Sequence, residues 1–202
     1  MSGLTRRAAA ILLVATIVAP AHAATTDAAG GFVDKLGQDT IAVLDRIGPD
    51  EAARRKAIAA LLDEAVDLEL IARLCLGRHW RTASEGERAE YVRLFRDNVL
   101  AVLARRMGFY TGGERFVVTA TQPAGGGAMG SSEIIYASND PPRRVEGRVR
   151  INGGAPVIID VLPEGVSLVL TYRSEFDEVM ARGGMEGLLQ ELRARAKSQA
   201  RA

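Results

Sequence analysis

The chain has 202 residues, with 26 lysines and arginines against 25 aspartates and glutamates, and a formal net charge of +1 at pH 7. This balance disfavours a nucleic-acid-binding protein, which would carry a marked basic excess. The single cysteine excludes an internal disulfide, so packing must hold the fold together.

Residues 1–23 have the pattern of an export signal. A pair of arginines is followed by an apolar run at residues 8–19 and by Ala21-His22-Ala23, a small-x-small cleavage site. An uncleaved membrane anchor is the alternative, but the apolar run is too short to span a bilayer comfortably. We therefore predict a cleaved signal peptide at 1–23 and a single domain at 24–202.

Helices are predicted first in the mature chain. Residues 32–47 and 49–64 are helical in pattern, and Asp67 can cap a third helix that stops or bends near Gly77. Two overlapping capping boxes, Thr82…Glu85 and Ser84…Glu87, precede a long helix. That helix carries one apolar stripe, formed by Tyr91, Leu94, Phe95, Val99, Val102 and Leu103. The stripe predicts that this helix packs into the core, or that it forms one wall of a ligand cavity if the helix stands away from a sheet.

From Arg115 the period changes to that of strands. The predicted strands cover residues 116–121, 133–136, 145–151, 156–159 and 166–171, and they are followed by helices at 174–182, capped by Ser174, and at 185–197. Helices, an antiparallel meander and further helices together predict an α+β domain, with helices packed over one face of a curved sheet.

Nucleotide and metal sites are disfavoured. Gly125-Gly126-Gly127-Ala128-Met129-Gly130 satisfies G-x-G-x-x-G, but a strand rather than a helix follows it, so we predict a hairpin loop. Cys75 and His79 lie four apart on a predicted helix, yet no second cysteine or mature histidine could complete a metal site. We expect no metal and no cofactor.

Hydrolase chemistry is equally weakly supported, because the chain has no Gly-x-Ser-x-Gly elbow. Asp160 lies in a predicted strand and could act as an acid or base, but it lacks a partner, so a structural role at the strand end is preferred. The basic cluster Arg143, Arg144, Arg148 and Arg150 predicts a solvated outer sheet face, with a docking surface for anionic groups as the alternative.

One stretch is more specific than these motifs. Asp160-Val161, Gly165-Val166-Ser167-Leu168 and Tyr172-Arg173-Ser174-x-Phe176 occur in order, as in the periplasmic phospholipid-binding proteins of the Mla pathway. Two further blocks also match. The earlier one runs from Asp67 through Ile71-Ala72-Arg73, Leu76-Gly77, Trp80-Arg81 and Glu87-Arg88 to Phe95, and the later one is Gly184-Met185-Glu186-Gly187-Leu188-Leu189. The chain thus resembles the MlaC family. It departs where Ala155-Pro156-Val157 replaces the usual Trp-Lys pair before the Asp-Val strand.

The resemblance implies an NTF2-like α+β fold in which a curved antiparallel sheet and helices enclose an apolar cavity. It further implies a monomeric periplasmic carrier, not an enzyme, that binds phospholipid acyl chains. Its partners would be an inner-membrane ABC transporter complex and an outer-membrane lipoprotein complex. Strand alternation and the resemblance together suggest nine pocket residues: Phe95, Val99, Leu103, Val117, Ile135, Val149, Val161, Leu168 and Tyr172.

Three alternatives stay open at this point. The cargo could be a hopanoid or another lipid, because the family has members in hopanoid gene clusters. The protein could be an NTF2-like enzyme that uses Asp160, or an adaptor that binds only protein. Copurifying lipid would separate a carrier from the last two.

Overall fold

The computed structural model describes residues 21–107, 110–138 and 140–199. Residues 1–20 of the predicted signal peptide lie outside the described residues, and its last three residues begin helix α1 (Ala21–Ile47). Helices α2 (Glu51–Ala65), α3 (Leu68–Leu76) and α4 (Glu85–Met107) follow, with the 3-10 helix η1 (Gly77–Arg81) between α3 and α4, and α5 (Leu168–Gln199) closes the described chain.

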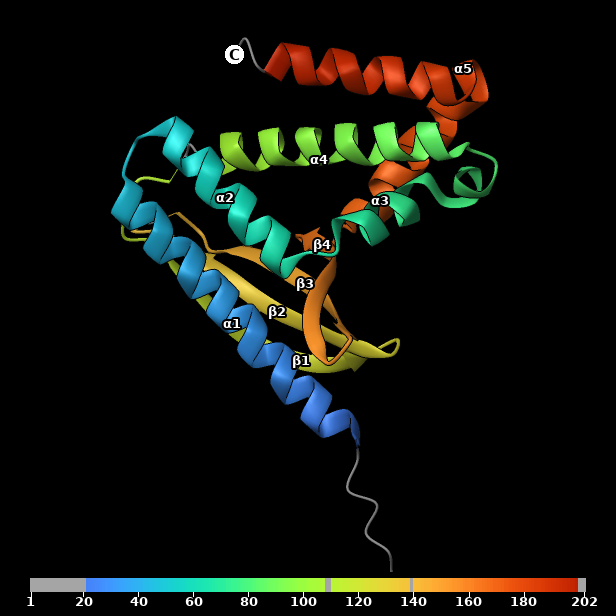
Figure 1. The fold of residues 1–202 in the computed structure, drawn as a ribbon. Helices are drawn as coiled ribbons and strands as arrows, with labels where there is room; N and C mark the ends of the chain where they lie inside the picture. The colour runs from blue at the N-terminus through green and yellow to red at the C-terminus, as the bar shows by residue number, and fades with distance from the viewer. Residues whose placement is uncertain (1–20, 108–109, 139, 200–202) are drawn as a thin grey trace, which may run out of the picture.

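Four strands form one antiparallel sheet in the order β1-β2-β3-β4, namely β1 (Arg115–Ala124), β2 (Gly127–Ile135), β3 (Arg143–Asn152) and β4 (Ala155–Pro163). Helix α1 lies across one face of the sheet, and α2, α4 and α5 are arranged beyond that face (Figure 1). The described chain is therefore α+β, as the order of elements predicts. No helix in its three described ranges is both long and apolar enough to span a membrane.

Side-chain caps start the helices at the expected places. The carboxylate of Asp67 accepts a hydrogen bond from Leu70 N at 3.0 Å. Ser84 and Glu87 form the predicted capping box, since Ser84 N donates to Glu87 Oε2 at 2.8 Å and Glu87 N donates to Ser84 Oγ at 3.3 Å. The overlapping box at Thr82 is not formed, because its hydroxyl donates to the His79 carbonyl instead.

Two glycines let α1 approach the sheet closely. Gly130 and Gly147 pair across β2 and β3, and both face Val33 of α1. A Cβ at Gly130 would lie 3.1 Å from Val33 Cγ2, so a larger residue there would push α1 away. The predicted glycine loop is shorter than expected: only Gly125 and Gly126 form the turn, and the rest of the motif belongs to β2.

The predicted last strand at residues 166–171 is wrong, because α5 begins at Leu168. Ser167 caps this helix by accepting from Leu170 N at 3.1 Å, and Asp160 of β4 accepts from Val169 N at 3.1 Å. This local cap and the contact from β4 together override the strand preference of the local sequence. The two predicted closing helices, at 174–182 and 185–197, are halves of α5, which breaks at Gly184 (φ 59°, ψ −160°).

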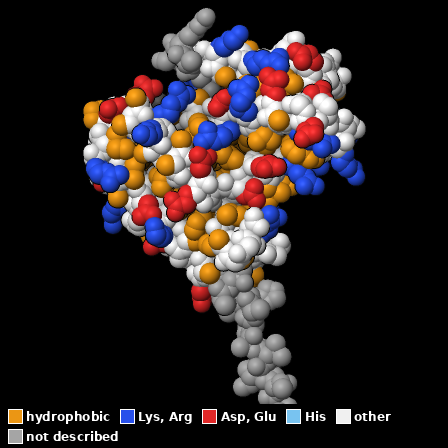
Figure 2. Space-filling view, in the orientation of Figure 1, with side chains coloured by type: hydrophobic (Ala, Val, Ile, Leu, Met, Phe, Trp, Pro, Cys, Tyr) orange, Lys and Arg blue, Asp and Glu red, His pale blue; other side chains and the backbone are white. Residues whose placement is uncertain are grey.

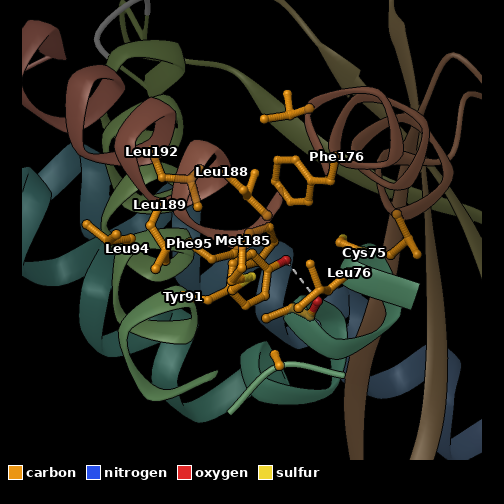
Figure 3. Close-up of a cluster of buried hydrophobic side chains, with 14 residues drawn as sticks. Cys75, Leu76, Tyr91, Leu94, Phe95, Phe176, Met185, Leu188, Leu189 and Leu192 are labelled. Carbon is orange, nitrogen blue, oxygen red and sulfur yellow. Dashed lines mark hydrogen bonds between the residues drawn. The ribbon is translucent and has the colours of Figure 1, made fainter. Parts of the chain in front are cut away.

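The largest apolar core lies between α3, α4 and α5 (Figure 3). Tyr91 and Phe95 of α4 meet Phe176 of α5, and the Tyr91 and Phe176 rings are 5.9 Å apart in an edge-to-face arrangement. The buried Tyr91 hydroxyl donates to the Ala72 carbonyl of α3 at 2.9 Å, which satisfies its polar atom. The N-terminal part of the α4 stripe therefore serves the core.

Candidate functional site

An apolar cavity of about 380 Å³ lies between the helices and the inner face of the sheet. Its size falls within the roughly 300–1,000 Å³ typical of small-molecule sites. Its walls come from α1, α2, the C-terminal end of α4 and all four strands. The lining comprises Val33, Leu36, Gly37, Thr40, Ile41, Leu44, Ile58, Leu61, Leu62, Ala65, Val66, Leu103, Arg106, Tyr110, Glu114, Phe116, Ser132, Ile134, Tyr136, Val145, Glu146, Gly147, Ile158 and Val161.

Helix α1 forms one wall because its lining residues, at positions 33, 36, 37, 40, 41 and 44, follow the helical period. Val33, Leu36, Ile41 and Leu44 thus share one helical face. Opposite them, strand residues two apart point to the same side of the sheet, as Ser132 does with Ile134 and Val145 with Gly147. The helical period of α1 and the two-residue period of the strands therefore give the cavity an almost wholly apolar lining.

Both acidic groups of the lining, and its hydroxyls at Thr40, Tyr110 and Ser132, already have partners. Glu114 accepts from the N–H groups of Thr111 and Gly112 at 2.9 Å, and the Ser132 hydroxyl donates to the Val145 carbonyl at 2.7 Å. Burial acts to raise the pKa of the Glu114 carboxyl, but these N–H groups and the Thr111 hydroxyl outweigh it and lower the pKa below its ordinary value. Glu114 therefore stays ionised at neutral pH.

Two further lining groups are also paired. The Tyr110 hydroxyl donates to Asp45 Oδ1 at 2.6 Å, and burial followed by this carboxylate raises the pKa of Tyr110 to about 12. The Glu146 carboxylate accepts from the Ser131 hydroxyl at 3.1 Å and from the Arg144 guanidinium at 2.6 Å. These acids and hydroxyls therefore stabilise the walls.

Of the nine predicted pocket residues, Leu103 and Val161 line this cavity. Phe95, Val99 and Tyr172 line a smaller cavity, of about 30 Å³, between α4 and α5. All five remain predictions as lipid contacts.

The other four predicted residues lie elsewhere. Val117 and Ile135 each follow a lining residue on their strand, so they point to the opposite face of the sheet. Val149 is buried beside Ala128 on the inner face, and Leu168 is 38% exposed at the start of α5. None of the four is among the residues that line the large cavity.

The α1 and α2 walls were missed from the sequence. The stripe of Leu36, Ile41 and Leu44 was visible, but the same pattern is expected of a helix packed directly on a core. A cavity wall differs from a core only in how far α1 and α2 stand from the sheet.

Asp160 has a structural position. Its two carboxylate oxygens accept from the Ser167 hydroxyl at 2.6 Å and from Val169 N at 3.1 Å, and it does not line the large cavity. It therefore fixes the end of β4 to the N-terminus of α5, which gives no support to an acid–base role.

The remaining sequence candidates lie away from the cavity. Cys75 is buried in the core, and burial raises the pKa of its thiol to about 12. His79 Nε2 lies 2.8 Å from Asp177 Oδ1. Among residues 21–107, 110–138 and 140–199, no group of three or more histidine, cysteine and acidic side chains is placed to hold a metal.

The predicted basic cluster is partly neutralised. Arg144 pairs with Glu146 at 2.6 Å, and Arg150 pairs with Asp67 at 3.7 Å. On the face shown in Figure 2, basic and acidic side chains are interspersed.

The sequence model of the MlaC protein family matches residues 34–194. The chain belongs to the MlaC family. A phospholipid-binding protein from Ralstonia solanacearum, whose structure was determined in complex with a phospholipid, has a similar fold with a TM-score of 0.75. It is 20% identical to this MlaC family member, and the match covers 85% of this chain and 98% of that one. The predicted NTF2-like α+β fold, with helices over one sheet face, is thereby confirmed.

Proposed function

We propose that this protein is a lipid carrier that holds the acyl chains of a phospholipid in the cavity between α1, α2, α4 and the sheet. The observation that carries the proposal is the apolar lining of that cavity, whose acidic groups are already bound to protein donors. Family membership supports it, and so does the similar phospholipid-bound protein.

The energetics favour a carrier over free diffusion of lipid. Each methylene removed from water contributes about 0.8 kcal/mol, so two chains of about thirty methylenes in all would contribute a gross term of roughly 24 kcal/mol. A lipid bound in this way does not leave into water on a useful timescale. Release therefore requires docking on a membrane complex.

The cellular role follows as part of the proposal. The protein is exported through the signal at residues 1–23, acts in the periplasm as a monomer, and carries lipid between outer-membrane and inner-membrane complexes of an Mla-type ABC transport system. It needs no cofactor and performs no catalysis. A hopanoid would leave the carrier role intact and change the cargo.

The first test is mass spectrometry of the purified protein, in its native state and after solvent extraction. A stoichiometric diacyl phospholipid is the expected result. A protein that is empty and also takes up no lipid from vesicles or detergent would refute the proposal and favour an enzyme or an adaptor.

Three variants test whether the lipid binds in the cavity. Leu103→Arg places a charge in the lining and should abolish lipid retention, whereas Leu170→Arg makes the same change at a site that is 63% exposed and should retain lipid. Val161→Phe narrows the cavity without adding charge and should reduce lipid content. Circular dichroism establishes that each variant is folded. Full lipid retention in both Leu103→Arg and Val161→Phe would place the lipid elsewhere.

A further inference from the structure

The cavity has one lining residue that differs from all the others in exposure and charge. Arg106, in the last turn of α4, is the single exposed member of the lining within the described residues, and it is also the single cationic member. A guanidinium group in contact with solvent therefore forms part of the cavity lining.

No other charged group of the lining is available to a ligand. The Glu114 carboxylate is held by Thr111 and Gly112, and the Glu146 carboxylate by Ser131 and Arg144. Arg106 forms no ion pair or hydrogen bond with any residue in the described ranges. Arg106 is thus a cation in an otherwise largely apolar lining, it is the lining residue most exposed to solvent, and it has no ion pair or hydrogen bond within the described residues.

A planar guanidinium is well suited to a phosphate, because its N–H groups can donate two parallel hydrogen bonds to phosphate oxygens. We propose that Arg106 binds the lipid phosphate and orients the lipid, with its tails along α1 and the sheet and its headgroup at the C-terminal end of α4. This inference rests on the proposed carrier function and names the residue that selects phosphate-bearing over neutral lipid.

The test separates phosphate recognition from binding of the tails. Delipidated protein is mixed with detergent-dispersed dioleoylphosphatidic acid or dioleoylglycerol, which share their acyl chains and differ by the phosphate. Bound lipid is separated by gel filtration and quantified by mass spectrometry. Arg106→Gln removes the cation, and Arg106→Lys keeps the charge but loses the planar pair of donors.

Arg105 supplies the matched control. It is also exposed on α4 but does not line the cavity, so Arg105→Gln makes the same change in charge one residue away. Arg106→Gln should bind dioleoylphosphatidic acid roughly ten- to a hundredfold more weakly, which is the loss expected for hydrogen bonds to a charged group. Its binding of dioleoylglycerol should be unchanged. Arg106→Lys should recover part of the loss, and Arg105→Gln should behave as the wild type.

Three results would overturn the inference. An equal loss for both lipids in Arg106→Gln would make Arg106 a packing residue, and no loss for either would remove it from the site. A rise in melting temperature caused by inorganic phosphate alone, and lost in Arg106→Gln, would assign the residue to free phosphate. A wild-type protein that binds neither lipid would instead refute the carrier function itself.

Discussion

Gly37 on α1 offers a sharp test of how closely this helix packs on the sheet beside the cavity. Glycine within a helix costs about 1 kcal/mol relative to alanine, so Gly37→Ala should stabilise the protein if helix propensity alone decided the outcome. The structure predicts the reverse, because a Cβ at position 37 would overlap the ring of Phe116 on β1.

Gly31 of the same helix provides the comparison, because nothing lies within 4 Å of a Cβ placed there. Gly31→Ala should therefore gain the full ~1 kcal/mol of helix propensity. Overpacking typically costs about 1–3 kcal/mol, so Gly37→Ala should end between neutral and about 2 kcal/mol less stable than the wild type. The two alanine variants should thus differ by about 1–3 kcal/mol.

Urea unfolding and thermal melting both measure this difference. For a chain of this size each kcal/mol shifts the melting temperature by roughly 2–4 °C, so the gap should be roughly 2–12 °C. Phe116 also lines the cavity, so its displacement should lower the lipid content of Gly37→Ala but not of Gly31→Ala. Equal stabilisation by both substitutions would refute the close approach of α1 to β1.

Three other predictions follow from polar and ionisable groups. Asp160→Ala leaves Ser167 and Val169 N without their acceptor, so it should lower the free energy of unfolding in urea by about 1–3 kcal/mol. Lipid retention by the folded variant should stay normal, and a loss of lipid at full stability would contradict the structural role of Asp160. Ser84→Ala removes the capping box of α4 and should cost about 1 kcal/mol, and an unchanged unfolding midpoint would show that this cap contributes nothing. Burial raises the pKa of Cys75 to about 12 from 9.0, so the native thiol should resist iodoacetamide at pH 8 and react once urea unfolds the chain. Rapid labelling of the native protein would instead show that the thiol is accessible. Since the native state holds this proton more tightly, its contribution to stability is complete below pH 9 and is lost as the pH rises toward 12. Cys75→Ala should therefore reduce the loss of stability between pH 9 and 12, and the part that remains belongs to Tyr110 and the other tyrosines whose pKa is raised.

Local signals were reliable wherever a few neighbouring residues decide the structure. The caps at Asp67 and Ser84 were predicted from the residues that follow them, because a capping side chain bonds to the backbone two or three positions away. The turn between β3 and β4 depends on equally local chemistry, since Gly153 and Gly154 readily adopt the positive φ that it requires. The resemblance to the MlaC family likewise depended on short ordered motifs.

The start of α5 shows where local signals fail. Residues 166–171 have the composition of a strand, yet Asp160, on the preceding strand, accepts from the first turn of a helix. Its partners are nine residues apart, and the bond exists only when β4 and α5 meet in the folded chain, so the composition of residues 166–171 does not reveal it. Tertiary contacts of this kind routinely outweigh local preference.

The sequence by itself determined the α+β class, the order of most elements and the family, because periodicity, caps and short motifs are local properties of the chain. Only the tertiary structure decided which apolar residues line the cavity and which fill the core. On α4 alone, Phe95 is buried in the core while Leu103 of the same stripe lines the cavity. Both are apolar at helical spacing, and what separates them is whether another element packs against that turn or stands away from it.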